Sequence, residues 1–157
     1  MMLLKYILFF SVFILVPKHE LVKAPDFEFT LENGSVKKLS DYKGEVVYLS
    51  FWASWCGPCI SNYKKYHEVR TKLESMGVVL LNISIDKQKE NWGKSLDKNI
   101  VINGVNAHGN DLDLIQSNYQ LSSIPLYEIL NKKGEFVYLS EAYPRDIFAD
   151  FQKWLDE

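Results

Sequence analysis

Two cysteines, the only ones among 157 residues, stand three positions apart in the stretch SFWASWCGPCISNY, residues 50–63. They lie between an apolar run and a segment with helical periodicity. A C-x-x-C pair can be a redox dithiol, half of a metal site or two unrelated thiols. In the first turn of a helix, residues i and i+3 lie on one side. Their β-carbons can then approach the roughly 3.8 Å that a disulfide requires, so the spacing favours redox chemistry.

The two sulfurs are expected to have different roles. Pro58 costs no hydrogen bond in a first helical turn, and Gly57 keeps that side of the turn open. Cys56 would meet the positive end of the helix dipole and the free N–H groups, which favour its thiolate. We therefore predict that Cys56 is exposed at the tip and attacks, and that Cys59, half a turn inside, resolves the mixed disulfide.

A closed zinc site would need two further ligands, and only His19, His67 and His108 are available. His19 lies in the N-terminal leader region. His67 follows Cys59 by eight residues, about 12 Å along one helix, which is too far to share a metal with it. Chance proximity of two thiols would not place them at the junction of a strand and a helix. The prediction is therefore a redox-active disulfide with no metal and no other cofactor.

The N-terminus is the most apolar part of the chain. Lys5 precedes an uninterrupted run of 11 residues from Tyr6 to Val16, the length of a signal-peptide core and short of the roughly 20 residues of a membrane span. Ala24 is the only small residue at a plausible cleavage position, between Lys23 and Pro25. Residues 1–24 are predicted to be a signal peptide or an uncleaved N-terminal membrane anchor. A buried N-terminal strand or helix is the alternative.

Composition describes an ordinary globular domain. Apolar residues make up 47% of the chain and charged residues 24%, and the net charge of −2 gives no reason to expect nucleic acid as a partner. Two cysteines are also too few for a small domain stapled by disulfides.

The order of elements predicts a single α/β domain. Val46 to Trp52 is β-branched and aromatic, which is typical of a central strand buried on both faces. Strand-like patterns cover residues 27–39 (a hairpin turning at Asn33-Gly34), 46–52, 78–85, 126–131 and 135–140. Helical patterns cover residues 58–76 (ended by Gly77), 86–98 (Asp86 as a possible cap), 110–119 (Asn110 placed to cap it) and 144–157 (Pro144 near its start). We expect a sheet with a parallel part and an antiparallel edge, and helices on both faces.

The stretch FWASWCGPC, residues 51–59, resembles the thioredoxins. The chain more closely resembles the extracytoplasmic thioredoxin-like thiol–disulfide oxidoreductases, the TlpA-like group, which includes membrane-tethered reductases serving cytochrome c maturation. The similar segments are APDFEFTLENGSVKKLSDYKGEVVYLSFWASWCGPC, LNISIDKQKENW and YQLSSIPLYEILNKKGEFV. The long stretch from Asp86 to Tyr119 is typical of a strand–helix insertion in the exported relatives. The resemblance implies a thioredoxin fold for residues 25–157, with an N-terminal hairpin and that insertion.

The resemblance also implies the roles of individual residues. Cys56 would be the nucleophile and Cys59 the resolving thiol. Ile124-Pro125 would be a cis peptide bond whose neighbouring backbone receives an extended substrate strand, although a trans proline starting an edge strand is the alternative. Leu126, where the family often has threonine, would make the substrate-binding lip more apolar. The residues implied for that lip are Trp55, Gly57, Pro58, Ile124 and Pro125.

Two departures from the family concern protons. Thioredoxins have a buried aspartate six residues before the attacking cysteine, and this chain has Ser50 there. Many exported relatives have a glutamate six residues after it, and this chain has Asn62. Neither replacement is a base near neutral pH, so deprotonation of Cys59 would depend on water, or on Glu68 or Lys64 if the fold brings either close. The usual helix-kinking proline is also absent, replaced by Lys64.

The leading functional prediction is a thiol–disulfide oxidoreductase that reduces protein disulfides outside the cytoplasm, in the bacterial periplasm. Gly-Pro between the cysteines is the thioredoxin dipeptide, and thioredoxin is strongly reducing, at about −270 mV against about −120 mV for the periplasmic oxidant. Such a reductant needs recharging, which implies a membrane electron donor. Peroxide reduction is one alternative, although peroxiredoxins set their cysteine in a Thr/Ser-x-x-Cys context with an arginine partner. A peptide-binding module or chaperone on the same scaffold is the other.

Overall fold

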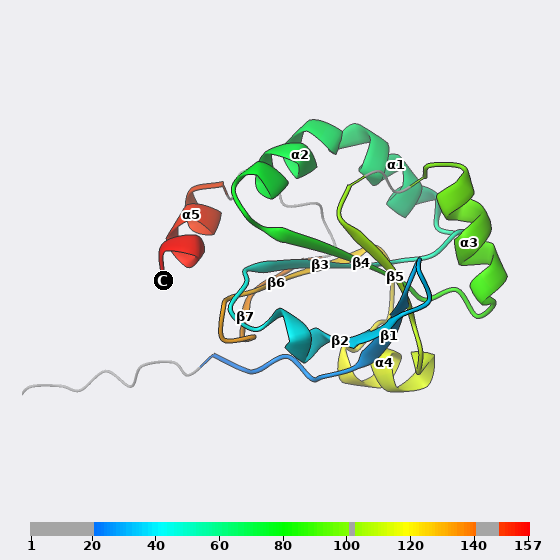
Figure 1. Ribbon diagram of the computed structural model, residues 1–157, viewed down its shortest axis with the longest axis horizontal. Coiled ribbons are helices and arrows are strands. Elements are labelled where there is room, and N and C mark those ends of the chain that lie inside the picture. The colour runs from blue at the N-terminus through cyan, green and yellow to red at the C-terminus, as the bar shows by residue number, and fades with distance from the viewer. Residues whose placement is uncertain (1–20, 101–102, 141–147) are drawn as a thin grey trace, which may run out of the picture.

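The computed structural model describes residues 21–100, 103–140 and 148–157, and these form one layered α/β unit around a seven-stranded sheet (Figure 1). The strand order is β2-β1-β5-β4-β3-β6-β7. The strands are β1 (Glu28–Leu31), β2 (Val36–Lys38), β3 (Val47–Trp52), β4 (Val79–Ser84), β5 (Val105–Gly109), β6 (Leu126–Leu130) and β7 (Phe136–Ser140). The helices are the 3-10 turn η1 (Leu39–Tyr42), α1 (Gly57–Lys65), α2 (His67–Ser75), α3 (Lys89–Asp97), α4 (Leu112–Asn118) and α5 (Phe148–Asp156).

The predicted fold class is confirmed. β3, β4 and β5 run parallel in the middle of the sheet, and antiparallel strands flank them on both sides. Every residue of β3 is buried, as expected for a central strand of β-branched and aromatic residues. β5 and α4 supply the strand and helix that the long stretch between Asp86 and Tyr119 was expected to hold.

Helices cover the two faces of the sheet unequally (Figure 1). α1 and α2 lie over one face, which we call the α1 face, and η1 and α4 lie over the other, the α4 face. Side chains alternate along β3, so Ser50 contacts Tyr63 of α1 while Leu49 and Phe51 belong to the cluster that includes Tyr119 just after α4. The terminal helix α5 packs on the α1 side, where Phe151 joins the cluster of α2 and the sheet.

The helix predicted over residues 58–76 is two helices. The backbone of Tyr66 departs from helical geometry, with φ −109° and ψ 23°, and separates α1 from α2 without a proline. The break falls where the buried face passes from the cluster of Tyr63 to that of Tyr66 and Leu73. The end of α2 agrees with the prediction, because Gly77 follows it with φ 91°.

Both predicted N-terminal helix caps were wrong. Gln88, not Asp86, stands at the N-cap of α3, and its side chain makes no capping bond. At α4 the cap is Asp111, whose carboxylate accepts the Leu114 amide at 3.0 Å. The Asn110 side chain instead accepts a hydrogen bond from Thr30 Oγ1 at 2.6 Å. Asp86 and Asn110 were expected to cap helices, but each forms hydrogen bonds with a residue distant in the sequence instead.

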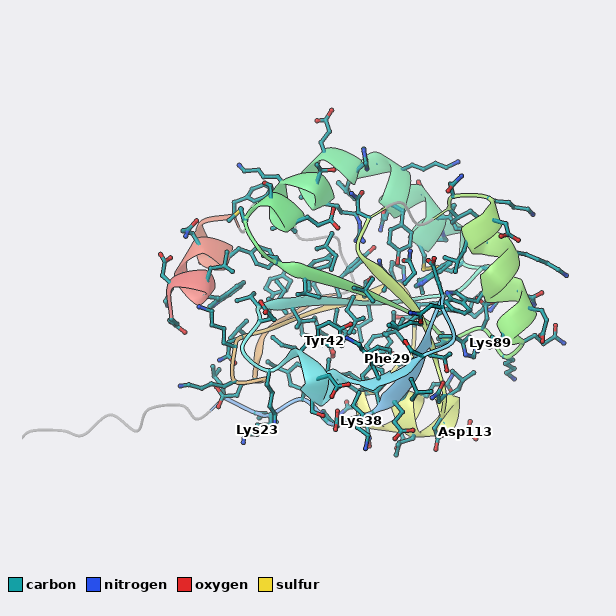
Figure 2. All side chains as sticks on the ribbon, viewed as in Figure 1. Lys23, Phe29, Lys38, Tyr42, Lys89 and Asp113 are labelled. Carbon is teal, nitrogen blue, oxygen red and sulfur yellow. A yellow bond between two sulfur atoms is a disulfide. The ribbon has the colours of Figure 1, made fainter. Side chains whose placement is uncertain are left out.

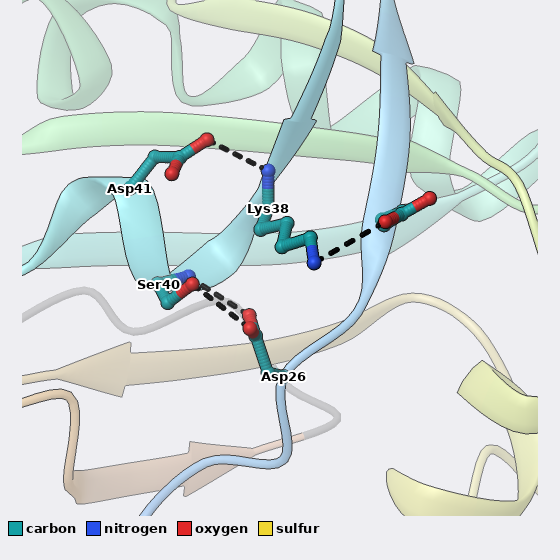
Figure 3. Close-up of polar contacts among 5 residues, drawn as sticks. Asp26, Lys38, Ser40 and Asp41 are labelled. Atoms are coloured by element: carbon teal, nitrogen blue, oxygen red, sulfur yellow. Dashed lines mark hydrogen bonds and ion pairs between the residues drawn. The ribbon is translucent and has the colours of Figure 1, made fainter.

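Side-chain hydrogen bonds connect the segment before β1 and the end of β2 to the 3-10 turn η1. Asp26 accepts hydrogen bonds from the backbone and the side chain of Ser40, at 2.9 and 2.8 Å, and Asp41 accepts the Lys38 amide (Figure 3). Phe29 and Tyr42 stack beside these bonds, with ring centroids 6.2 Å apart (Figure 2). These contacts therefore hold the predicted hairpin against η1 on the α4 face.

The N-terminal segment joins the far end of the sheet from the cysteines. Ala24 N donates to Gly134 O at 2.9 Å, and Phe136 N donates to Val22 O at 2.9 Å. Residues 1–20 of the predicted leader, and Pro144 at the predicted start of the last helix, lie outside the described residues. Within the described ranges, no helix is both long and apolar enough to cross a bilayer.

Candidate active site

Cys56 and Cys59 form a disulfide at the start of α1, with their α-carbons 5.3 Å apart. The loop after β3 delivers Cys56 to the N-cap of α1, where its sulfur accepts the Cys59 amide at 3.2 Å. That amide is one of the N–H groups that a first helical turn leaves without an intrahelical partner. Pro58 occupies the first turn, as predicted. When the disulfide opens, this hydrogen bond and the helix dipole both favour a thiolate on Cys56.

The expected exposure of Cys56 was wrong for the disulfide form. Cys56 is 4% exposed and Cys59 is 1% exposed, so the difference between them has the predicted direction and is small. The exposed neighbours are Trp55, at 68%, and Gly57 and Pro58. A side chain at position 57 would meet no heavy atom within 4 Å, so this side of the turn is open.

The loop before β6 covers the attacking sulfur. Ile124-Pro125 is a cis peptide bond, as the resemblance implied. Ile124 O lies 3.8 Å from Cys56 Sγ, and both Ile124 and Pro125 are half-buried. Leu126 is 6% exposed and belongs to the core, so the expectation that it forms part of the lip was wrong.

A cleft of about 710 Å³ opens next to Trp55 and Ile124. The residues between β4 and α3 form one wall, and the end of α4 with the loop that follows it forms the other. Its lining mixes apolar side chains, including Leu121, with the neutral polar side chains of Asn91, Gln116 and Ser122 and with one residue of each charge, Asp86 and Lys87. This composition suits an extended polypeptide segment better than a strongly charged small molecule.

A buried carboxylate fixes the loop that carries the cysteines. Asp86, directly after β4, is 1% exposed. It accepts hydrogen bonds from Ser54 N at 2.9 Å, Ser54 Oγ at 2.7 Å and Ser84 Oγ at 2.8 Å. Because Ser54 stands two residues before Cys56, these bonds set the path of the chain into the active-site turn.

Ser50 and Asn62, the two positions where the family resemblance implied carboxylates, both face the α1 side of the sheet. Ser50 is fully buried, with Oγ 3.3 Å from the Tyr63 hydroxyl, and Asn62 Nδ2 donates to the Tyr127 hydroxyl at 2.9 Å. Ser50 and Tyr127 are direct cross-strand neighbours. Glu68 and Lys64, considered above as proton acceptors, are both exposed on the outer side of the helices. They are therefore not placed to serve Cys59 in this structure.

A buried arginine completes the polar cluster. Arg70 of α2 is 1% exposed and donates from Nη2 to Asn82 Oδ1 at 2.8 Å and to Asn103 O at 2.9 Å. Asn82 Oδ1 also accepts Ser50 Oγ at 2.9 Å, so the two residues share one acceptor. Sequence reasoning missed Asp86, Arg70 and Asn82. An asparagine inside the otherwise apolar run VVLLNISI was the signal that a buried polar partner existed.

Glu128 is the buried acid on the opposite face of the sheet. It is 2% exposed, and its Oε2 has no hydrogen-bond partner among the described residues. Burial raises the pKa of the Glu128 carboxyl to about 8, because removing it from water penalises the charged form. Burial, and after it the nearby Glu128 and Asp26, also raise the pKa of Tyr119. Sequence reasoning read Glu128 as part of an ordinary strand.

In the described part of the chain, no group of three or more His, Cys, Asp or Glu residues is placed to hold a metal ion. The redox group that the structure does contain is the Cys56–Cys59 disulfide.

Comparison with protein families gives a match to the AhpC/TSA family over residues 22–119. Among individual proteins, the thiol-disulfide oxidoreductase ResA of Geobacillus kaustophilus is 30% identical over 119 residues, covering 71% of this chain and 63% of that relative. The ResA of Bacillus subtilis is 28% identical over 117 residues and is also covered to 63%. The chain thus spans somewhat less than two thirds of the length of these relatives.

Solved structures match over more of the chain. A candidate thiol:disulfide interchange protein DsbE from Chlorobium tepidum superposes with a TM-score of 0.68 at 28% identity, covering 85% of this chain and 90% of that one. The thioredoxin domain of a thiol-disulfide oxidoreductase from Bacteroides vulgatus gives a TM-score of 0.72 at 19% identity, with 85% and 95% coverage. The second likeness shows that the fold is the thioredoxin fold.

Proposed function

The chain belongs to the AhpC/TSA family, and from this membership and the Cys56–Cys59 disulfide at the N-cap of α1 we propose that it is a thiol–disulfide oxidoreductase that reduces protein disulfides. The single observation that carries the proposal is the placement of this disulfide. It lies at a helix N-terminus, beside an exposed Trp55 and a cis-proline loop, next to a cleft that suits a polypeptide.

The reaction needs only the two sulfurs and the substrate. The Cys56 thiolate attacks one sulfur of a substrate disulfide, which forms a Cys56–substrate bond and releases the other substrate sulfur as a thiolate. The Cys59 thiolate then attacks Cys56 Sγ and releases the second substrate sulfur. Two electrons pass to the substrate, and the two protons lost by the cysteines end on its thiols. The protein is left with the Cys56–Cys59 disulfide seen in the structure.

Peptide binding in this proposal uses the residues around the disulfide. Trp55, Gly57 and Pro58 form one side of the lip, and the backbone of Ile124 and Pro125 forms the other. Cys56 must be more accessible during catalysis than its 4% exposure in the disulfide form, so substrate contact is expected to move the Ile124 side of the lip.

Several finer features belong to the same proposal. Residues 1–24 act as a signal peptide or a membrane anchor, which places the domain of residues 25–157 outside the cytoplasm, in the bacterial periplasm. A membrane electron donor recharges the dithiol there. The clients are protein disulfides, either in cytochrome c maturation or more generally. Fusion of residues 1–24 to a reporter enzyme active only after export tests the location, and an inactive reporter would contradict it.

The test of the reaction is reduction of insulin disulfides with a dithiol as electron source. We expect wild type to accelerate reduction, Cys56→Ser to lose all acceleration, and Cys59→Ser to accumulate a covalent mixed disulfide with the substrate. If Cys56→Ala kept its biological role while losing this activity, the protein would be a peptide-binding module instead.

Peroxide consumption is the matched second assay, and we expect none above background. Arg70, a buried arginine on the cysteine side of the sheet, bonds Asn82 and Asn103 and not Cys56. Rapid peroxide turnover that depends on Cys56 alone would overturn the proposed function.

A further inference from the structure

Arg70 carries a charge that cannot be neutralised by deprotonation, because a guanidinium stays protonated in proteins. It is 1% exposed, and no carboxylate of the described residues forms an ion pair with it. Its Nε and Nη1 have no hydrogen-bond partner among those residues, while Nη2 bonds Asn82 and Asn103. Among the described residues, the charge is compensated by the dipoles of Asn82 and Asn103 and by the rings of Tyr48 and Tyr63.

Asn82 holds this charge in a fixed place. Its Oδ1 accepts from Arg70 and Ser50, and its Nδ2 donates to Asn103 O at 2.8 Å and Asn106 Oδ1 at 3.0 Å. Both lone pairs and both hydrogens of the amide are then used, which leaves it one orientation. The network ties the cation to the Ser50 hydroxyl on β3.

The network reaches the helix of the resolving cysteine through Tyr63. The guanidinium carbon of Arg70 lies 4.8 Å from the centre of the Tyr63 ring. Tyr63 follows Cys59 by four residues in α1, so both side chains point from the same helix face, one turn apart. Adding a helical turn of about 5.4 Å puts the charge on the order of 10 Å from the Cys59 sulfur.

We propose that Arg70 is a positioning residue for the resolving step, whose buried charge, held by Asn82 and Tyr63, favours the thiolate of Cys59. The inference rests on the proposed function and adds to it. The chain has Ser50 and Asn62 where relatives have carboxylates, so no negative charge opposes a Cys59 thiolate from those two positions. In this proposal the buried charge of Arg70 takes the place of a carboxylate base. It does not accept the proton of Cys59 but stabilises the Cys59 thiolate that remains.

The step that benefits is the second exchange. The Cys59 thiolate forms a bond to Cys56 Sγ as the bond between Cys56 and the substrate breaks, and the substrate sulfur leaves with the electron pair. The proton lost by Cys59 reaches that sulfur through solvent. A unit charge about 10 Å away in a medium of effective dielectric about 20 lowers a thiol pKa by roughly one unit.

Other charged and titratable groups surround the cysteine helix and remain unchanged in the test. Asp86 lies beyond the loop that precedes α1, fixed by Ser54 and Ser84. Glu128 lies on the opposite face of the sheet. Others are the exposed Lys64, Lys65, His67 and Glu68 on α1 and α2, the exposed Lys87 after β4, and the phenols of Tyr48, Tyr63, Tyr66 and Tyr127.

The direct test is a titration that needs no substrate. In a Cys56→Ser background, Cys59 is the only thiol of the chain, and serine keeps the N-cap. Thiolate absorbance against pH gives its pKa. We expect Arg70→Met in that background to raise the pKa of Cys59 by about one unit. Arg70→Gln, which loses the charge and keeps hydrogen-bond donors, should do the same and serves if the methionine variant does not fold.

Two controls separate charge from packing. Arg70→Lys keeps a cation only while the buried ammonium stays protonated, so the pKa of Cys59 should fall between those of the parent and Arg70→Met. Leu73→Ala removes a 2% exposed side chain from the same helix, without any charge, and should destabilise the protein while leaving that pKa in place. An unchanged pKa in both Arg70→Met and Arg70→Gln, or an equal rise in Leu73→Ala, would overturn the proposal.

Kinetics of the two-cysteine protein distinguish this result from a failure of the proposed function. A symmetric nitrobenzoate disulfide releases one coloured thiolate in the attack by Cys56 and a second in the attack by Cys59. Arg70→Met should slow the second release about threefold at neutral pH, since the loss of thiolate is partly offset by a more nucleophilic thiol. The first release should change less. No release by wild type would count against the oxidoreductase itself.

Discussion

Arg70 and Glu128 are buried on opposite faces of the central sheet, and the two faces treat the charge of these side chains in opposite ways. On the α1 face, Arg70 lies among Asn82, Asn103 and two tyrosine rings, with a hydrogen bond to each of the first two. On the α4 face, Glu128 is 2% exposed, and its Oε2 has no hydrogen-bond partner in the described part of the chain. A guanidinium cannot discard its charge, whereas a carboxyl can keep its proton.

The buried charges of the two faces therefore respond differently to pH. Under the redox helix lies the Arg70 guanidinium, which stays charged near neutral pH, beside the Asn82 amide, whose oxygen and nitrogen each make two hydrogen bonds. The other face holds a group that titrates near neutrality and is separated from the cysteine helix by the sheet. Three measurements test this difference between the faces.

The largest expected effect is the pH dependence of stability caused by Glu128. The pKa of its carboxyl is about 8 in the folded protein against 4.5 ordinarily, so the folded state holds the extra proton between these values. The free energy of unfolding should then fall as pH rises from 4.5 to 8, by at most about 5 kcal/mol, and level off above. Urea unfolding of wild type across this range measures the fall.

Glu128→Gln is the matched control for that slope. The amide is nearly isosteric and does not titrate, so the difference between variant and wild type isolates Glu128 from all other groups. We expect the variant to lack this component of the slope and to be the more stable protein at pH 8. Parallel curves for the two proteins would show that Glu128 is ionised when folded, and the contrast between the faces would fail.

The second effect is the loss of Arg70. Arg70→Ala leaves a cavity beside Tyr63 and removes two hydrogen bonds from buried acceptors, so we expect the free energy of unfolding to drop by about 3 kcal/mol. In the disulfide form, in which neither cysteine titrates, the drop should be the same at pH 5 and pH 8, because a guanidinium does not titrate there either. Arg70→Met keeps most of the packing and should lose less than half as much. A strong pH dependence of the Arg70→Ala effect would contradict the assignment of a permanent charge.

Periodicity and turn residues predicted the fold and the redox pair, because both are local. The buried run at residues 46–52, the hairpin at Asn33-Gly34 and the C-x-x-C spacing each express a backbone requirement in a few adjacent residues. The cis bond before Pro125 followed from family resemblance.

The supporting polar residues could not be predicted because each pairs across the chain. Asp86 looked like a helix cap and instead bonds Ser54, 32 residues away. Arg70 belongs to a helical stretch whose neighbours are charged, and only the packing of α2 against β4 turns it inward toward Asn82. Glu128 lies in a strand that is otherwise apolar on both faces, so the sequence pattern did not show that its side chain is buried. Burial of single polar groups is decided by tertiary packing.

The smallest effect concerns Tyr119, which lies near Glu128 and donates a hydrogen bond to Pro25 O. Tyr119→Phe should lower the free energy of unfolding by about 1 kcal/mol, the usual net value of one such bond. Because burial raises the pKa of this phenol, it stays a neutral donor while Glu128 titrates, so the cost should be equal at pH 5 and pH 8.

Tyr42→Phe is the control for this loss of a hydroxyl. Tyr42 lies on the same face and stacks on Phe29, and no hydrogen bond of its hydroxyl is seen among the described residues. Its replacement should therefore lower the free energy of unfolding by less than about 0.3 kcal/mol. A Tyr119→Phe cost that grows as Glu128 ionises would mean that the phenol also solvates the carboxylate, and the α4 face would then hold a polar pair much as the α1 face does.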